Sequence, residues 1–111
     1  HGTATPANDV AEGLAVSGVF GTALGAGVPC SSTKGITGHT LGAAGALEAV
    51  ACALALEHGL LPPSVGTRTP DPAIPVDLIM LPRTASLRHV LSNSFGFGGS
   101  NASLLLSRRG A

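Results

Sequence analysis

The stretch from Thr40 to His58 constrains the fold most, because it predicts a helix that carries little side-chain bulk on one side. Leu47, Val50, Ala51 and Leu54 recur at the i, i+3, i+4 and i+7 spacing of an amphipathic helix. The remaining positions are mostly alanine and glycine, so the helix is apolar nearly all round. Each interior glycine costs roughly 1 kcal/mol of helix propensity. We therefore expect a packing reason for them, namely a helix buried between closely spaced layers.

The composition supports the same expectation. The chain has 111 residues, the size of one small domain, and is 44% hydrophobic but only 3% aromatic. Charged residues make up 11% of it, whereas about a quarter is usual for a soluble domain. We expect much of its surface to meet other protein, either as part of a larger body or in a tight oligomer.

Several classes of function are disfavoured. The formal net charge is zero and the one basic run is Arg108-Arg109, so we expect no nucleic-acid partner. The longest apolar run, Ala49 to Leu56, is far shorter than the roughly 20 residues of a membrane span, and no signal peptide is visible. Two cysteines, Cys30 and Cys52, do not suggest a disulfide framework. A reducing, cytoplasmic setting is expected.

Helix and strand signals alternate along the chain. Asp9 with Glu12 fits a capping pattern, with Asn8 as a rival cap, for a helix that Gly21 can close. A short strand with Pro29 at its start or edge follows, and then the apolar helix, which Gly59 ends.

The C-terminal part reads as strands. "VDLIM" is a plausible strand, and "RHVLSNS" and "NASLLLSR" are two more, joined by the glycine-rich turn "FGFGGS". The order helix, strand, buried helix, strand, strand predicts an α/β fold: a mixed sheet with helices on its faces.

Three stretches concentrate the polar groups. They are "HGTATPAND" with His1, Thr3, Thr5 and Asp9, "STKGITGH" with Lys34 and His39, and "NSFGFGGSN" with backbone N–H groups that its glycines free. All lie at ends of expected strands or starts of expected helices, the edge where open α/β sheets bind ligands.

Each stretch also has a purely structural interpretation. His1 can belong to a solvated loop, Lys34 and His39 can cap helices, and a glycine-rich hairpin is often only a turn. Glu48 is more informative, because a carboxylate inside an apolar helix needs a partner, and Lys34 is the obvious candidate. No phosphate loop, zinc spacing or GxSxG nucleophile elbow is found, so no metal is expected.

Taken together, the three stretches resemble the C-terminal half of a beta-ketoacyl-acyl carrier protein synthase, a condensing enzyme of the thiolase superfamily. "HGTATPAND" looks like that family's HGTxTxxND block, "STKGITGHTLGAAGALE" like its KxxxGHxxGAAG block, and "NSFGFGGSNA" like its GFGGxNA block. The resemblance runs over the whole chain, with the blocks in the family's order.

The resemblance implies a thiolase-like, five-layered α-β-α-β-α body made of two similar halves. Residues 1–111 would form an incomplete C-terminal domain with a mixed, five-stranded type of sheet and the alanine- and glycine-rich helix between layers. The N-terminal half of the same protein and a second copy, in a homodimer, would be its partners.

The resemblance also implies a decarboxylative Claisen condensation. A cysteine takes an acyl group as a thioester, and malonyl carried on acyl carrier protein loses carbon dioxide and attacks it. His1 and His39 would donate N–H bonds to the enolate, and the Phe97 N–H would serve the acyl oxyanion. Substrates arrive on the phosphopantetheine of acyl carrier protein, and no other cofactor is expected.

Other positions match supporting roles in the family. Lys34 would pair with Glu48 and favour neutral His39, and the Phe97 side chain would act as a gate. Thr3 and Thr5 match positions that bind the phosphopantetheine arm. Asp9 and Asn101 match positions taken as supporting.

The nucleophilic cysteine has no match here. Cys30 precedes the lysine loop and Cys52 lies inside a helix, so the cysteine belongs upstream and this chain alone should be inactive. A non-catalytic, chain-length-factor-like partner and a structural fragment remain alternatives. Whether the pathway makes fatty acids or polyketides, and with what chain length, stays open.

Overall fold

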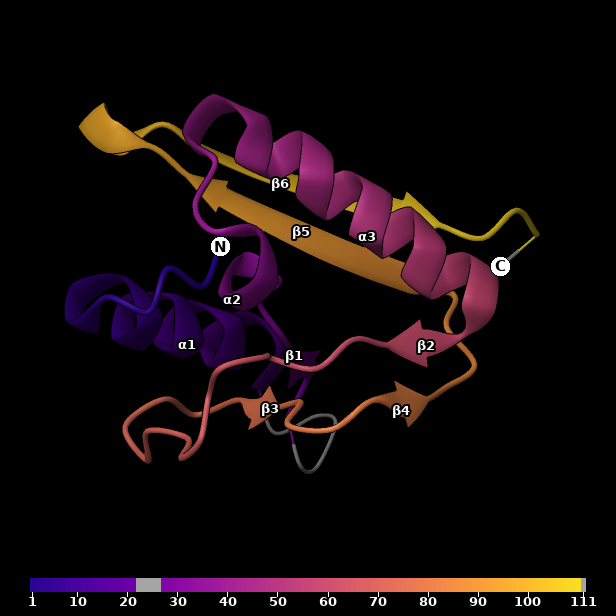
Figure 1. Ribbon diagram of the computed structural model, residues 1–111, viewed down its shortest axis with the longest axis horizontal. Helices are drawn as coiled ribbons and strands as arrows, with labels where there is room; N and C mark the ends of the chain where they lie inside the picture. The colour runs from indigo at the N-terminus through magenta and orange to yellow at the C-terminus, as the bar shows by residue number, and fades with distance from the viewer. Residues whose placement is uncertain (22–26, 111) are drawn as a thin grey trace.

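The computed structural model describes residues 1–21 and 27–110. Three helices and six short strands follow one another along the chain (Figure 1). The helices are α1 (Pro6–Phe20), α2 (Lys34–Thr37) and α3 (Ala44–His58), and the 3-10 turn η2 (Leu41–Ala43) leads into α3. The strands are β1 (Pro29–Cys30), β2 (Leu60–Leu61), β3 (Asp77–Leu78), β4 (Arg83–Thr84), β5 (His89–Phe95) and β6 (Asn101–Ser107).

The β5–β6 hairpin is the longest strand pair and confirms the expected pairing. Its antiparallel register runs from His89 opposite Ser107 to Phe95 opposite Asn101. The connecting turn contains the 3-10 segment η3 (Phe97–Gly99), in which Gly98 and Gly99 have φ values of 80° and 83°. Only glycine adopts such angles readily, so these two residues allow the tight reversal.

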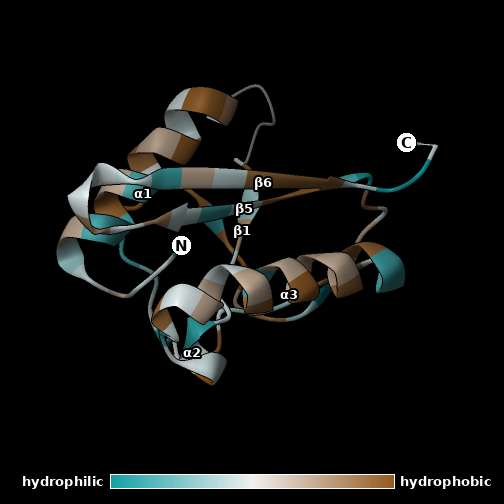
Figure 2. Ribbon diagram, turned by 90° about the horizontal axis from the view of Figure 1, so that it is seen from above, coloured by the Kyte–Doolittle hydropathy of each residue, from teal (hydrophilic) through white to brown (hydrophobic). Residues whose placement is uncertain are grey.

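Helix α3 lies along β5, as Figures 1 and 2 both show. Its predicted end is confirmed, and Gly59, with φ 61°, ends it by donating its N–H to the carbonyl of Ala55, whereas its start lies at Ala44 and not at Thr40, because the 3-10 turn η2 comes first. Small residues face the hairpin: a Cβ built on Gly45 would lie 3.3 Å from the Ser94 Oγ, and Ala44 and Ala55 are buried. The glycines and alanines therefore allow a close approach to the hairpin.

The expectation that α3 is buried on all sides is wrong for this structure. The stripe of large residues expected in the core is exposed, with Leu47 at 45%, Val50 at 59% and Leu54 at 49%. The physical reason is that the described elements cover α3 mainly from the hairpin side. Its other side is exposed, and the pale to brown colouring of most of α3 in Figure 2 shows that the helix is largely apolar.

One helical segment of the described residues, Leu41–His58, is long and apolar enough to pass as a membrane span by length and composition. The core helix of a water-soluble protein passes the same test; α3 contacts β5 and β2, while 17% of the Leu41–His58 stretch is buried in the described structure.

The other strands pair in two short units. β1 runs parallel to β3, and β2 runs antiparallel to β4. Within residues 1–21 and 27–110 the pairing is therefore mixed, as expected, but the three pairs do not join into one sheet. Ile79, directly after β3, is the most buried large side chain at 2% exposure.

Helix α1 begins earlier than its capping pattern predicted. Thr5 is the N-cap without a side-chain hydrogen bond, and Pro6 occupies the first turn, where its missing N–H costs nothing. Asn8 and Asp9 thus lie inside the helix and do not cap it. Gly13 packs against the 62–76 connection, since a Cβ there would lie 2.7 Å from Ile74 Cγ2.

Candidate active site

Two histidines from distant segments meet at the centre of the site. The ring centroids of His1 and His39 lie 5.3 Å apart at an interplanar angle of 86°, an edge-on contact. The ring of Phe95, at the end of β5, lies 5.6 Å from His1 on an angle of 64°. The structure therefore brings together His1 and His39, the two histidines predicted from the sequence. It also places the ring of Phe95 beside His1, which the sequence did not predict.

Lys34 ties the two histidine segments to α3. Its Nζ donates to the backbone carbonyl of His1 at 2.5 Å and forms an ion pair with Glu48 Oε1. The two side chains are only 7% and 13% exposed, so each buried charge depends on the other. The Lys34–Glu48 pair expected from the sequence is confirmed. Among the described residues, Glu48 Oε2 and His1 Nδ1 are buried without a hydrogen-bond partner.

His39 follows the single turn of α2. Gly38, with φ 69°, ends α2 and lets the chain turn toward the site. The Leu41 N–H donates to His39 Nδ1 at 3.4 Å. A ring nitrogen that accepts a hydrogen bond carries no proton, so in a neutral imidazole this geometry places the proton on Nε2. That tautomer can donate one hydrogen bond to a substrate oxygen.

Carboxylates of α1 hold the loop that carries His1. Glu12 Oε1 and Oε2 accept hydrogen bonds from the backbone nitrogens of His1 at 2.7 Å and Gly2 at 2.8 Å. Asp9 Oδ1 accepts the Ala4 N–H at 3.2 Å. Asp9 thus supports the loop, the place that the resemblance gave it.

The environment of Glu12 favours its charged form. Burial raises the pKa of Glu12, but the free amino group of His1, through its hydrogen bond and its positive charge, and the hydrogen bonds from Gly2 and Asn8 outweigh it, so the pKa is lowered overall. Glu12 is therefore a fixed negative charge near neutral pH. Sequence analysis assigned it only to a cap; the signal that could have identified its role is its place three residues after Asp9, on the same side of α1.

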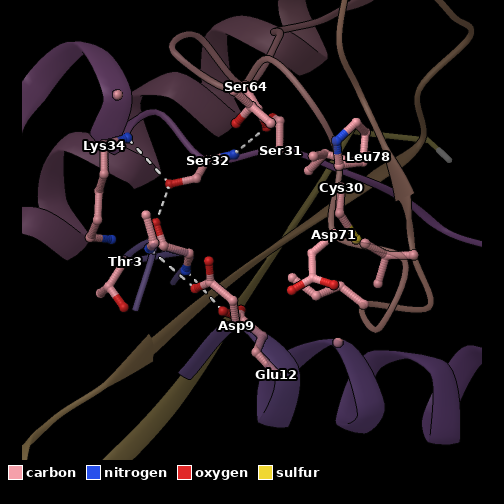
Figure 3. A pocket seen from close by; sticks show the side chains of 18 of the residues that line it. Thr3, Asp9, Glu12, Cys30, Ser31, Ser32, Lys34, Ser64, Asp71 and Leu78 are labelled. Atoms are coloured by element: carbon pink, nitrogen blue, oxygen red, sulfur yellow. Dashed lines mark hydrogen bonds between the residues drawn. The ribbon is translucent and has the colours of Figure 1, made fainter. Parts of the chain in front are cut away.

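A cavity of about 680 Å³ gathers five predicted site residues from separate segments: Thr3, Thr5, Asp9, Lys34 and His39. Figure 3 shows Thr3, Asp9 and Lys34 around it. The hydroxyls of Thr3 and Thr5 lie 2.9 Å apart and hydrogen-bond to each other.

A second cavity, of about 660 Å³, is lined by His1 and Glu48. Cys30, Ser32 and Glu12 line both cavities, so the two share a wall. The site therefore lies between these two hollows.

The structure does not bring Phe97 and Asn101 to either cavity. The Phe97 side chain is fully exposed at the tip of the hairpin, and Asn101 pairs with Phe95 across it. Phe95 is the hairpin residue that contacts His1. Sequence analysis missed it, although its place at the end of an alternating strand just before the glycines is the signal that marks it.

Neither cysteine is suited to act as a nucleophile. Burial, followed by the charge of Glu12, raises the pKa of the Cys30 thiol to about 11. Burial and the charge of Glu48 also raise the pKa of Cys52. The reactive form of cysteine is the thiolate. Because their pKa values are raised, both residues stay in the unreactive thiol form near neutral pH. No cluster of three or more His, Cys, Asp or Glu suited to a metal ion occurs among the described residues.

Comparison with known proteins gives a consistent result. Residues 1–68 match the family model described as "Beta-ketoacyl synthase, C-terminal domain". The chain is 46% identical over 112 residues to the mitochondrial 3-oxoacyl-[acyl-carrier-protein] synthase of Arabidopsis thaliana, which covers 96% of this chain and 24% of that protein. The chain thus spans about a quarter of the length of the curated relatives it matches.

Two solved structures are also similar. The ishigamide ketosynthase/chain length factor has a TM-score of 0.89 at 42% identity, covering 96% of this chain and 26% of that one. A type II polyketide ketosynthase in complex with its acyl-carrier protein and bound to the hexaketide has a TM-score of 0.89 at 34% identity, with coverage of 96% and 26%.

Proposed function

Because the chain belongs to the beta-ketoacyl synthase family, with a thiolase-like α/β fold, we propose that it forms the C-terminal part of a condensing enzyme. The full-length protein joins an acyl thioester to malonyl carried on acyl carrier protein, with loss of carbon dioxide. The observation that carries this proposal is the edge-on contact of His1 and His39 beside the buried Lys34–Glu48 pair.

The reaction divides between the two parts of the protein. A cysteine outside residues 1–111 attacks the acyl thioester, and the carrier thiol leaves. The malonyl group then breaks its bond to the carboxylate, carbon dioxide departs, and the electron pair forms an enolate. The enolate carbon attacks the acyl-cysteine, and collapse of the tetrahedral intermediate releases the cysteine thiolate.

His1 and His39 act in the decarboxylation. An enolate oxygen gains negative charge as the carboxylate leaves, and two neutral imidazoles placed together can donate N–H bonds to it. The proton on Nε2 that the Leu41 contact favours suits neutral His39 to this role. Lys34 keeps a positive charge beside both segments and orders them, because it binds the His1 carbonyl and Glu48 at once.

The remaining sites are assigned by position. Thr3 and Thr5 would bind the amide groups of the phosphopantetheine arm, which fits their paired hydroxyls on the wall of the larger cavity. The Phe97 N–H would serve the acyl oxyanion and its exposed ring would act as the gate, with Asn101 supporting the turn. The flanking glycines, at φ 80° and 83°, would permit the motion of a gate, because glycine can adopt many backbone conformations.

The partners follow from the same assignment. Acyl carrier protein delivers both substrates and no other cofactor takes part. The N-terminal half of the same protein completes the body, and the assembly is a cytoplasmic homodimer. The solved ketosynthase with its acyl-carrier protein supports the first of these partners.

A chain-length-factor-like partner is the second candidate, because two similar structures contain such a subunit. A subunit of that kind performs no condensation and need not retain two histidines in contact with a buried lysine. The paired His1 and His39 favour the enzyme. The residue at the upstream nucleophile position separates the two: a cysteine supports the enzyme, and any other residue supports the partner.

The test uses the full-length protein with malonyl carrier and an acyl donor. His39→Ala should lower the condensation rate by roughly 100-fold to 1,000-fold, the cost of losing one donor to a developing oxyanion. Transfer of the acyl group to cysteine should continue. His58→Ala, at the exposed end of α3, is the matched control and should react like the wild type. Near-normal condensation by His39→Ala would refute the assignment.

A further inference from the structure

The 62–76 connection contains a buried serine that the proposed mechanism does not use. Ser64 is 6% exposed and is the one polar residue classed as buried in the described chain. Its backbone N–H donates to the carbonyl of Ile79 at 2.8 Å, which anchors it beyond the end of β3. Its Oγ accepts the backbone N–H of Ser32 at 3.2 Å. A buried hydroxyl in this arrangement satisfies a main-chain donor that would otherwise be unpaired.

Ser32 links the 62–76 connection to both the His1 loop and α2. Its Oγ donates to the carbonyl of Gly2 at 2.7 Å and accepts the N–H of Lys34 at 3.3 Å. Figure 3 shows Ser64, Ser32 and Lys34 joined by these bonds. The hydrogen-bonded pair of Ser64 and Ser32 therefore contacts Gly2, the neighbour of His1, and Lys34, the first residue of α2, at the same time.

Two close backbone contacts fix the same arrangement. A Cβ on Gly35 would lie 1.9 Å from the carbonyl oxygen of Val65, so the connection presses directly on α2. A Cβ on Gly2 would lie 2.6 Å from Ser32 Cβ, and Gly2 has φ 49°. The hydroxyl bonds thus lie where the main chains already touch, so a shift of Ser32 or of the connection is transmitted to the His1 loop and to α2.

We propose that Ser64 is a positioning residue for decarboxylation, acting through Ser32 to hold Lys34 and the His1 loop in register. The inference rests on the proposed function and extends it to a connection that supplies none of the assigned reacting groups. Loss of the Ser64 hydroxyl leaves the Ser32 N–H unsatisfied, and Ser32 then shifts relative to Gly2 and Lys34. Lys34 then no longer holds the His1 carbonyl in one place relative to His39.

The experiment measures two half-reactions in the full-length protein. Ser64→Ala should lower kcat for malonyl decarboxylation and condensation by about 10-fold to 100-fold, since small misplacements of reacting groups have effects of this order. The KM for the malonyl carrier and the rate of acyl transfer to cysteine should change little. Ser64→Thr keeps the hydroxyl and should restore kcat to near the wild-type value. Ser103→Ala, which removes an exposed hydroxyl on β6, is the control.

A double-mutant cycle adds a readout that a general loss of stability would not produce. Ser32→Ala and Ser64→Ala should be non-additive in kcat, because both remove the same link. If Ser64→Ala does not fold, Ser64→Cys replaces it, since sulfur fills the position, although it is larger than oxygen, and accepts hydrogen bonds only weakly.

The outcomes separate the two proposals. A wild-type protein that neither decarboxylates nor condenses refutes the proposed function. An active wild type in which Ser64→Ala keeps its kcat refutes the positioning role. Equal losses in acyl transfer and decarboxylation would also refute it, because they would show a structural effect on the whole protein.

Discussion

Lys34 shows how a single buried charge can organise a site. Its ammonium contacts the His1 carbonyl and the Glu48 carboxylate while remaining 7% exposed. Removing either partner of such a pair leaves an uncompensated buried charge, which is far more costly than the pair itself. The pair was predictable, because a glutamate in an apolar helix requires a cation. The contact of Phe95 with His1 was not, since it depends on how the hairpin docks on the loop.

Glu12 gives a prediction at the residue scale. In residues 1–111 with a free amino group at His1, the pKa of Glu12 is lowered in the folded chain, so Glu12 contributes stability above its ordinary value near 4.5, and that contribution is lost as the pH falls through the lowered value. Glu12→Gln should therefore reduce the free energy of unfolding most near neutral pH. The difference from the wild type should shrink in acid.

Denaturant titration between neutral and acid pH measures this difference. Glu57→Gln, an exposed carboxylate on α3, serves as the control and should retain the wild-type pH dependence. A Glu12→Gln deficit that stays constant at every pH would mean that the charge of Glu12 plays no part.

At the scale of elements, local sequence patterns predicted the helices and strands whose formation depends on neighbouring residues in the sequence. The β5–β6 hairpin follows from two alternating strands and a glycine-rich turn, and α3 from its small and apolar periodicity. The start of α1 was wrong, because Pro6 took precedence over the Asp9 pattern. The single turn of α2 was not predicted. Whether so short a helix forms depends on its packing against Val65 more than on its own sequence.

Gly35→Ala tests this contact. A methyl group there would meet the Val65 carbonyl at 1.9 Å, so we expect a loss of about 1–3 kcal/mol in stability, as for overpacked sites. Thermal unfolding of the full-length protein measures it. Gly18→Ala in α1, where nothing lies within 4 Å of the new methyl group, should raise the stability by up to about 1 kcal/mol. Two variants of equal stability would contradict the packing described.

At the scale of the whole molecule, the solvent-accessible surface is larger than that of a typical monomeric protein of the same mass. The radius of gyration, 13.4 Å, is close to the roughly 13 Å of a compact domain of this length. The accessible surface is 7181 Å², against roughly 5,500 Å² for a monomer of 10.8 kDa. The excess agrees with two large cavities and an open side of α3. Low charge predicted this need for a covering partner, whereas the separation into three strand pairs could not be predicted from local patterns.

The most direct test of the account is to locate the acyl group on the full-length His39→Ala protein after both substrates have been added. Peptide mass mapping should find it on a cysteine outside residues 1–111, stable to malonyl carrier, with Cys30 and Cys52 unmodified. This result would show that residues 1–111 supply the decarboxylation half of the site and not the nucleophile. Acylation of Cys30 or Cys52, or conversion of the acyl group to product at the wild-type rate, would contradict it.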